Sequence, residues 1–318
     1  MSRSVMVAAA QMGPVARSCS RADVVERLLM LLCTAVDRGA ELVIFPEVAL
    51  TPFFPHWLIE DGAELEAYFE EEMPNPSVAP LFETARSLGV AFTLGFAELD
   101  LAGDRRRFNT SVLVSPEGRV VGRYRKIHLP GTRESHPERP FENLEKRYFD
   151  VGDLGLPTWE MLGTRIGMCL CNDRRWPETF RAMGLQGVEL VALGYNTPHH
   201  NPVLPETDRL ADFHNHLSLQ AGAYLNSTWV VAAAKSGIEE GVHQIGGSCI
   251  VSPSGEIVAR ATTEQDEVIV AQADLELSRR YRELVFSPEV NRRPEHYGLA
   301  VSPPAGTPLE PSDDGRSL

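Results

Sequence analysis

Cysteine is scarce in this sequence, which has five in 318 residues: Cys19, Cys33, Cys169, Cys171 and Cys249. An odd number without regular spacing excludes a scaffold held together by disulfides and favours reduced thiols in a cytosol. At least one of these thiols is therefore a candidate reactive group.

Long hydrophobic runs are also missing. No stretch approaches the roughly 18 uninterrupted apolar residues of a membrane-spanning helix, and the apolar run near the start is too short for a signal peptide. These absences argue against a membrane protein, and we expect the chain to be cytoplasmic.

Basic residues are outnumbered, because 30 lysines and arginines face 44 aspartates and glutamates, which gives a net charge of −14 and a pI of about 5.1. Such a chain repels phosphate backbones and anionic lipids, so nucleic acids and membrane surfaces are poor candidates for partners. A small-molecule substrate is the better expectation.

The sequence does contain a series of short apolar runs that alternate with helical patterns, as is typical of an α/β protein. The expected strands are residues 4–12, 42–45, 90–96, 110–114, 165–170, 188–193 and 228–234. Most of them lack the polar alternation of a solvated face, so we expect sheets covered on both sides.

Two helices are predicted from the residues at their ends and from their apolar periodicity. Ser20 and Asp23 form a capping-box pattern before the apolar positions of a helix over 24–36, which Gly39 is expected to end. A second pattern with helical period covers 78–88 and stops at Gly89.

One segment recurs: VSPEGRVV at 114–121 returns as VSPSGEIV at 251–258. Both predict a hairpin around a type I turn, so the two halves of the chain are expected to share one arrangement of strands. We expect residues 1–301 to form a single domain. From Ser302 onward the chain is rich in Pro, Gly, Ser and Asp, and we expect residues 302–318 to be a disordered tail.

Glu47, Lys126 and Cys171 each stand where an apolar strand ends. Alone, each has an ordinary interpretation as an exposed acid, a surface base or a small buried side chain. Ligands of open α/β sheets, however, bind at strand ends, and a thiol becomes a strong nucleophile only when a base or a cation favours its thiolate. We therefore predict that these residues form a catalytic set. Pro177 suits the first turn of the next helix, so amides after Cys171 could face the oxyanion.

In the contexts FPE, YRKIHL and CNDRRWPE, these residues resemble the nitrilase (carbon-nitrogen hydrolase) superfamily, and the likeness runs from about Val5 to Leu299. The further motifs FPEVALTPFFP, RRFNTSVLV, LEKRYF, GYNTP and HYGL are similar to those of N-carbamoyl-D-amino acid amidohydrolases. The resemblance implies a four-layer αββα sandwich, assembled as a homodimer or homotetramer. We expect no metal and no cofactor.

The implied reaction is hydrolysis of N-carbamoyl-D-amino acids to D-amino acid, carbon dioxide and ammonia through a cysteine thioester. Cys171 would be the nucleophile, Glu47 the general base and then acid, and Lys126 the group that stabilises the oxyanion. Glu145 in LEKRYF matches a second glutamate of the family that positions the lysine or the substrate, although Glu142 lies close by.

Several residues are expected to bind the substrate by donating hydrogen bonds: Asn172, Arg174, Arg175, Asn196 and Thr197. The arginines, with Thr197, would hold a substrate carboxylate, and the asparagines are candidates for the ureido end. We expect at least one arginine to pair instead with an acid such as Glu178.

His128, His200 and His214 match histidines of the family and are expected to support the site through hydrogen bonds. His214 also shares a helix face with Leu217, which predicts a histidine in the core. Asn143 departs from the family, which has histidine at this position, and the consequence stays open.

Three alternatives remain. A metal-dependent amidohydrolase would use a different set of ligands, namely His199, His200, Asp212, His214 and His216. Positions 214 and 216 diverge by about 200° around a helix, which disfavours a shared ion. A non-catalytic scaffold is the second alternative. The third is an aliphatic amidase or a carbamoyl-β-alanine hydrolase with the same catalytic set, because the D preference rests on resemblance alone.

Overall fold

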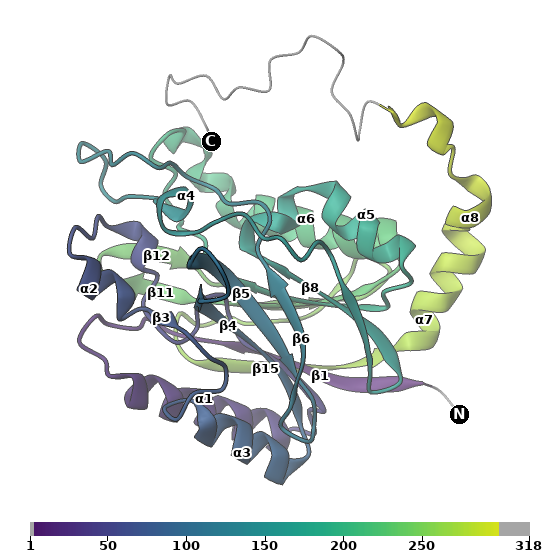
Figure 1. Ribbon diagram of the computed structural model, residues 1–318. Coiled ribbons are helices and arrows are strands. Elements are labelled where there is room, and N and C mark those ends of the chain that lie inside the picture. The colour runs from purple at the N-terminus through teal and green to yellow at the C-terminus, as the bar shows by residue number, and fades with distance from the viewer. Residues whose placement is uncertain (1–2, 299–318) are drawn as a thin grey trace.

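The computed structural model describes residues 3–298, in which two β-sheets face each other and helices cover their outer faces (Figure 1). The predicted four-layer αββα sandwich is confirmed. Residues 302–318, expected to form a disordered tail, lie outside the described residues.

The first sheet contains, in spatial order, β15 (Glu267–Asp274), β1 (Ser4–Gln11), β2 (Leu42–Ile44), β4 (Ala91–Asp100), β5 (Arg106–Val114) and β6 (Val120–Arg125), with β3 (Phe69–Glu70) paired to β4. The second contains β14 (Ile257–Arg260), β13 (Cys249–Val251), β10 (Trp229–Ala234), β9 (Leu190–Tyr195), β8 (Thr164–Leu170) and β7 (Thr158–Met161). A separate hairpin joins β11 (Ser236–Glu239) to β12 (Val242–Ile245).

The two sheets repeat one plan. Parallel strands β1, β2 and β4 form the centre of the first sheet, and β8, β9 and β10 form that of the second. Each centre continues into an antiparallel hairpin, β5–β6 or β13–β14. In both turns a glycine amide donates to a serine carbonyl, from Gly118 to Ser115 at 2.8 Å and from Gly255 to Ser252 at 2.9 Å. The repeat seen in the sequence is thus confirmed as a structural repeat.

Helices α1 (Arg21–Asp37) and α3 (Ala79–Leu88) cover the first sheet, and α5 (Pro177–Leu185) and α6 (Ala211–Asn226) cover the second (Figure 1). The predicted capping box at Ser20 and Asp23 is present, and Gly89 ends α3 in the left-handed conformation, with φ of 66°. No helix within residues 3–298 combines the length and apolar character needed to cross a membrane.

Short helical segments connect or follow these layers: η1 (Phe54–His56), α2 (Gly62–Glu66), α4 (Glu145–Tyr148), η2 (Cys171–Arg175), η3 (Pro205–Leu210), α7 (Leu275–Arg280), η4 (Tyr281–Phe286), α8 (Pro288–Asn291) and η5 (Pro294–His296). Two of them carry residues of the candidate site, because Glu145 begins α4 and Cys171 begins η2 directly after β8.

The core lies between the sheets and beneath the helices. Val7 and Ile44 of the first sheet and Val191 and Val231 of the second belong to one buried cluster. Burying a side chain of this size contributes about 1.5–3 kcal/mol. The packed sheets therefore give a rigid base from which the residues after β2, β6, β8 and β9 project.

The strands β4 and β5 extend further than their apolar runs predict. Their outer ends carry charged residues such as Glu98, which is buried and pairs with Arg123 and Arg125 at 2.5 and 2.8 Å. A prediction based on apolar runs misses strand ends of this kind, because the burial of a charged residue depends on partners elsewhere in the chain.

Candidate active site

The backbone at Glu47 passes through a narrow space between the two sheets. A Cβ atom at Gly95 of β4 would lie 2.5 Å from the Pro46 carbonyl oxygen, and one at Gly194 of β9 would lie 2.6 Å from the Glu47 nitrogen. Only glycine allows these close approaches. The packing of both sheets thus fixes the position of Glu47.

The Glu47 carboxylate is fully buried and held at both oxygens. Its Oε1 accepts hydrogen bonds from Lys126 Nζ at 2.7 Å and Asn109 Nδ2 at 2.8 Å, and its Oε2 accepts one from the Asn196 amide at 2.9 Å. The Asn196 side chain in turn donates to the Glu47 carbonyl at 2.8 Å. A base this firmly held needs little reorganisation before it takes a proton.

Lys126 follows β6 and lies between two carboxylates. Its Nζ is 2.7 Å from Glu47 and 2.6 Å from Glu145, and all three side chains are buried. Burial lowers the pKa of Lys126, but Glu145 and Glu47 outweigh it and the pKa is raised above its ordinary value. Lys126 is therefore a permanent cation in the site.

The structure decides between the two neighbouring glutamates in favour of Glu145. Burial raises the pKa of Glu145 to about 7, although Lys126 opposes that shift. Glu142 instead accepts hydrogen bonds from the Ser135 hydroxyl and the His136 amide. Glu142 thus organises a loop, whereas Glu145 contacts Lys126.

Cys171 begins η2 in the left-handed conformation, with φ of 42°. Non-glycine residues rarely adopt this conformation, and it often marks functional sites. The Sγ donates to the Asn196 carbonyl oxygen at 2.9 Å and lies 3.7 Å from Thr197 Oγ1. The turn directs the thiol away from β8 toward the residues that follow β9.

Burial and the Glu47 carboxylate raise the pKa of the Cys171 thiol, while Lys126 and Arg174 oppose the shift. Cys171 therefore rests as a thiol, and to act as a nucleophile it would need a base. Glu47 and Lys126 are close enough to act on this pKa, so the structure brings the predicted catalytic set together.

Arg174 corrects the prediction for the substrate-binding arginines. It is buried, donates to the Cys171 carbonyl at 2.6 Å and to Thr197 Oγ1 at 2.9 Å, and stacks on the Tyr195 ring at 4.8 Å. Its guanidinium thus supports the strained turn at Cys171 and is not free to form a fork for a carboxylate.

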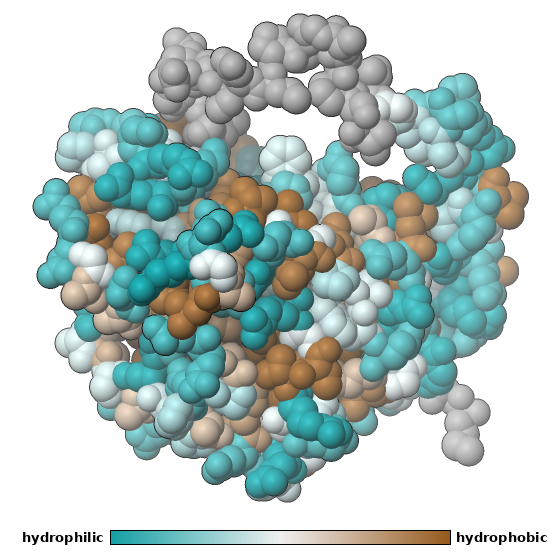
Figure 2. All heavy atoms as spheres, viewed as in Figure 1, coloured by the Kyte–Doolittle hydropathy of each residue, from teal (hydrophilic) through white to brown (hydrophobic). Residues whose placement is uncertain are grey.

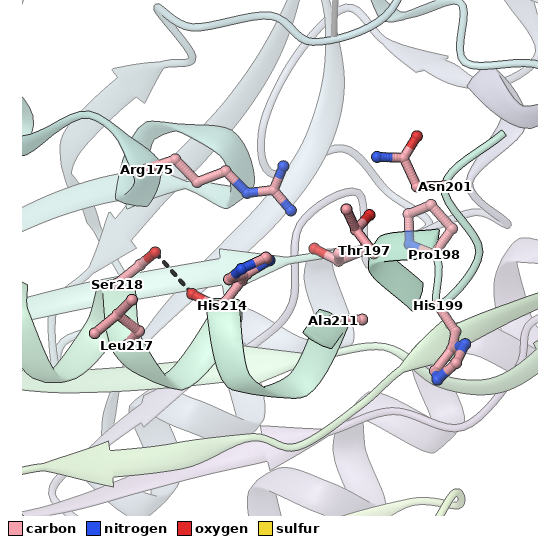
Figure 3. Close-up of a pocket in the computed structure, with 10 residues that line it drawn as sticks. Arg175, Thr197, Pro198, His199, Asn201, Ala211, His214, Leu217 and Ser218 are labelled. Atoms are coloured by element: carbon pink, nitrogen blue, oxygen red, sulfur yellow. Dashed lines mark hydrogen bonds between the residues drawn. The ribbon is translucent and has the colours of Figure 1, made fainter. Parts of the chain in front are cut away.

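The expected pairing of an arginine with an acid such as Glu178 is wrong. Within residues 3–298, neither Arg174 nor Arg175 takes part in an ion pair. Arg175 extends instead into a cavity of about 330 Å³, toward Thr197 and His214 (Figure 3). It is therefore a cation whose charge no described carboxylate balances.

His214 is exposed at the edge of the same cavity, which corrects its prediction as a core residue (Figure 3). The helical period of α6 was right but its phase was wrong: Asn215, His216 and Leu219 are buried, whereas Leu217 is 50% exposed. The buried face of α6 is the more polar one because it meets polar partners, such as Tyr195 with Asn215.

A larger cavity of about 480 Å³ continues from this pocket to the nucleophile. It is lined by Cys171 and Glu145 at one end and by apolar residues such as Phe141 and Leu204 elsewhere. Asn172, Asn196 and Thr197, predicted to bind substrate, also line it. The cavity has the size and mixed lining of a small-molecule site.

His128 and His200 each lie beside an aspartate. His128 Nδ1 lies 2.8 Å from Asp173, and its ring stacks on Trp176 at 5.0 Å. His200 Nδ1 lies 2.7 Å from Asp208, and His200 also lines the larger cavity.

Sequence reasoning gave no role to Asp173 or Asn109. Asp173 is fully buried and accepts hydrogen bonds from Tyr124 at 2.7 Å, from the Leu170 amide at 2.9 Å and from the His128 amide at 3.0 Å. It thus joins β6, β8 and η2 beside the nucleophile. Asn109 lies in the motif RRFNTSVLV and Asp173 in CNDRRWPE, but the position of a residue in a motif does not reveal its partners in the fold.

Asn143, the departure from the family pattern, packs tightly against a glycine turn. Its carbonyl accepts from the Thr132 amide at 2.9 Å and would lie 2.0 Å from a Cβ at Gly131, which has φ of 76°. Asn143 also lines the larger cavity, so its side chain contributes to the pocket wall.

The ligands proposed for a metal site are dispersed. His199 stacks on His243 at 5.5 Å, and Asp212 pairs with Arg260 at 3.3 Å. Among the described residues, no three His, Cys, Asp or Glu side chains are arranged to hold a metal ion. The geometry therefore favours the cysteine site over the metal alternative.

Comparison with known proteins agrees with this geometry. Residues 6–283 match the carbon-nitrogen hydrolase family. The chain belongs to this family. Nitrilase from Pyrococcus abyssi is 31% identical, with 79% of this chain and 84% of the relative covered. N-carbamoylputrescine amidase from Arabidopsis thaliana is 30% identical, with 86% and 88% covered.

A crystal structure of a carbon-nitrogen hydrolase from Helicobacter pylori has a TM-score of 0.81 at 22% identity, covering 94% of this chain and 99% of that one. This similarity shows the shared fold. The family match identifies the protein as a carbon-nitrogen hydrolase.

Proposed function

We propose that this carbon-nitrogen hydrolase removes the carbamoyl group from N-carbamoyl-D-amino acids. The observation that carries the proposal is Arg175, a cation without a described carboxylate partner, in a pocket that adjoins the cavity of Cys171. A ureido acid offers both groups that this arrangement needs, a carbonyl for the thiol and a carboxylate for the guanidinium.

In the first half of the reaction, Glu47 takes the proton from the Cys171 thiol, and the thiolate attacks the carbamoyl carbon. The charge that develops on the oxygen lies near Lys126, and the backbone amide of Asn172 stabilises it as well. Glu47 returns its proton to the departing nitrogen, ammonia leaves, and a carbamoyl thioester remains on Cys171.

In the second half, water enters the site of ammonia and Glu47 removes one of its protons. The resulting hydroxide attacks the thioester carbon, the C–S bond breaks, and Cys171 regains its proton. The product carbamate loses carbon dioxide to give the free amino acid. Glu145 keeps Lys126 in position through both halves, by the 2.6 Å contact to its Nζ.

The charges around the pocket favour an anionic substrate. Arg175 and Arg139 line the larger cavity, and Glu145, the carboxylate among its described lining residues, is paired with Lys126. A substrate with a terminal ammonium, such as the one that the N-carbamoylputrescine amidases are named for, would find no free carboxylate in this lining. A charge-assisted hydrogen bond to a carboxylate contributes about 1.5–3 kcal/mol.

The second candidate is an amidase for simple aliphatic amides or for carbamoyl-β-alanine. The same catalytic set would serve it, and the relatives named nitrilase and amidase favour it. The D configuration in our proposal rests on the sequence motifs. A panel of D and L carbamoyl amino acids, carbamoylputrescine, carbamoyl-β-alanine and simple amides tests these choices, and equal rates on both enantiomers would contradict the D assignment.

A variant at Arg175 tests the carboxylate contact directly. Arg175→Gln is expected to raise KM for a carbamoyl amino acid about tenfold to a hundredfold, because one charge-assisted contact is lost. A simple amide without a carboxylate serves as the control and should keep its KM. An equal effect on both substrates would exclude Arg175 as the carboxylate anchor.

A further inference from the structure

His56, which the mechanism does not use, belongs to the wall of the catalytic cavity. It ends η1 and is buried, with 4% of its surface exposed, yet it lines the same cavity as Cys171. Its ring contacts two aromatic rings edge-on, Phe53 at 4.8 Å and Phe141 at 5.2 Å. Packing on two sides fixes the plane of the imidazole.

The protonation of His56 is also fixed. Burial, together with the nearby Lys235 ammonium, lowers the pKa of His56 to about 3, so the ring is neutral at physiological pH. The Gln244 side-chain amide from β12 donates to its Nδ1 at 3.4 Å. When Nδ1 accepts, the ring proton is on Nε2, and within residues 3–298 that atom has no hydrogen-bond partner.

The surroundings of His56 suit an aromatic ring on the substrate. Phe53 and Phe141 contact its ring and line the cavity with it, so these neighbours are apolar, and Val203 and Leu204 line the same cavity. The carboxylate would lie elsewhere, at Arg175. An apolar region that contains one hydrogen-bond donor favours a substrate side chain that is mostly apolar and carries one acceptor. The reason is that a buried polar group without a partner is costly.

We infer that His56 is a specificity-determining residue, whose Nε2–H donates to an uncharged acceptor on an aromatic substrate side chain, as the hydroxyl of a tyrosine-like ring would provide. This inference rests on the proposed function, because it assumes a carbamoyl amino acid whose side chain occupies the part of the cavity beside His56.

The test compares kcat/KM for carbamoyl-D-tyrosine and carbamoyl-D-phenylalanine, which differ by one hydroxyl. The wild type should prefer the tyrosine derivative by about threefold to tenfold, the effect of one hydrogen bond. In His56→Leu the ratio should fall to about 1. The control Val203→Ala changes an apolar residue of the same cavity and should keep the ratio.

A second comparison needs no variant and stands if His56→Leu fails to fold. Carbamoyl-D-phenylalanines with a 4-methoxy or a 4-ethyl group have equal numbers of heavy atoms, and only the methoxy oxygen accepts a hydrogen bond. The wild type should prefer the methoxy derivative. Equal rates in this pair, or a tyrosine preference that persists in His56→Leu, would overturn the role of His56 and leave the proposed function standing.

If the wild type hydrolysed simple amides but no carbamoyl amino acid, the proposed function and the inference built on it would both be wrong. Turnover of the carbamoyl amino acids with no preference between the paired rings would overturn the inference alone. The two failures are therefore distinguishable.

Discussion

At the scale of single residues, the site is a balance of charges around one thiol. Glu47 raises the pKa of Cys171, and Lys126 and Arg174 lower it. Because burial adds to the effect of Glu47, the resting thiol stays protonated and the enzyme avoids a permanently reactive thiolate. Reactivity then depends on transfer of the proton to Glu47 when a substrate is bound.

This balance predicts the pH dependence of alkylation. Burial and Glu47 raise the pKa of the Cys171 thiol above its ordinary value, so its reaction with iodoacetamide should become faster as the pH rises through the alkaline range. Glu47→Gln removes a charge that raises this pKa, so the profile should shift to lower pH while amide turnover is lost. Mass spectrometry of the peptide containing Cys171 measures the rate.

Glu142→Gln is the matched control for this experiment, because Glu142 is bonded to Ser135 and His136 and not to Lys126. It should leave the alkylation profile where it is. A profile that is the same in Glu47→Gln and the wild type would show that Glu47 does not act on the thiol.

Variants of the two neighbouring arginines, Arg174 and Arg175, should differ in their kinetic effects. Arg174→Lys loses the planar stack on Tyr195 and the contact to the Cys171 carbonyl, so kcat should fall about tenfold to a hundredfold with KM little changed. The loss should be equal for substrates with and without a carboxylate, unlike that of Arg175→Gln. Steady-state kinetics on both substrate types checks this, and a selective rise in KM would return Arg174 to a substrate-binding role.

At the scale of elements, close backbone contacts with both sheets position Glu47. Gly95 belongs to β4 and Gly194 to β9, so the chain at Glu47 is enclosed by one strand from each sheet. The position of Glu47, the proposed base, thus depends on the spacing of the two sheets. A change in either strand would move Glu47 relative to Lys126.

Gly194→Ala should therefore destabilise the protein by about 1–3 kcal/mol, the usual effect of overpacking a core, and should lower kcat. A Cβ there meets the Glu47 nitrogen at 2.6 Å, and backbone atoms have little room to move. Urea unfolding gives the change in free energy. Gly62→Ala is the control, since no atom lies within 4 Å of its Cβ position; equal stability of the two variants would refute the argument.

At the scale of the whole molecule, the surface carries apolar groups that the single chain leaves uncovered. The face turned to the viewer in Figure 2 is mixed, with apolar patches among hydrophilic residues, and apolar side chains also project near α8 at its right edge. Leu284 is 75% exposed and Val290 is 72% exposed, on the segment that follows α7. Apolar groups left uncovered in this way suit an assembly interface.

The expected homodimer or homotetramer would cover this segment. Exchange of Leu284 and Val290 for glutamate should lower the mass measured by light scattering, because charges would enter the interface. Val121→Glu, a change at another exposed apolar residue, is the control and should leave the mass unchanged. An unchanged assembly in the double variant would place the interface elsewhere.

The sequence by itself determined what depends on local chemistry and short spacing. The alternation of strands and helices, the capping box at Ser20, the repeated hairpin turns and the types of residue at the ends of β2, β6 and β8 were all predictable, because each rests on neighbours a few positions apart. The family resemblance added the sandwich, which the structure confirms.

Only the tertiary structure decided which partners these residues have. Glu47 meets Lys126 and Asn196 from 79 and 149 residues away, and such contacts have no local signal. The choice of Glu145 over Glu142, the support of Cys171 by Arg174, and the exposure of His214 all follow from which surfaces pack together. Local pattern gives a side chain its chemistry, but packing of distant segments gives it its neighbours and hence its role.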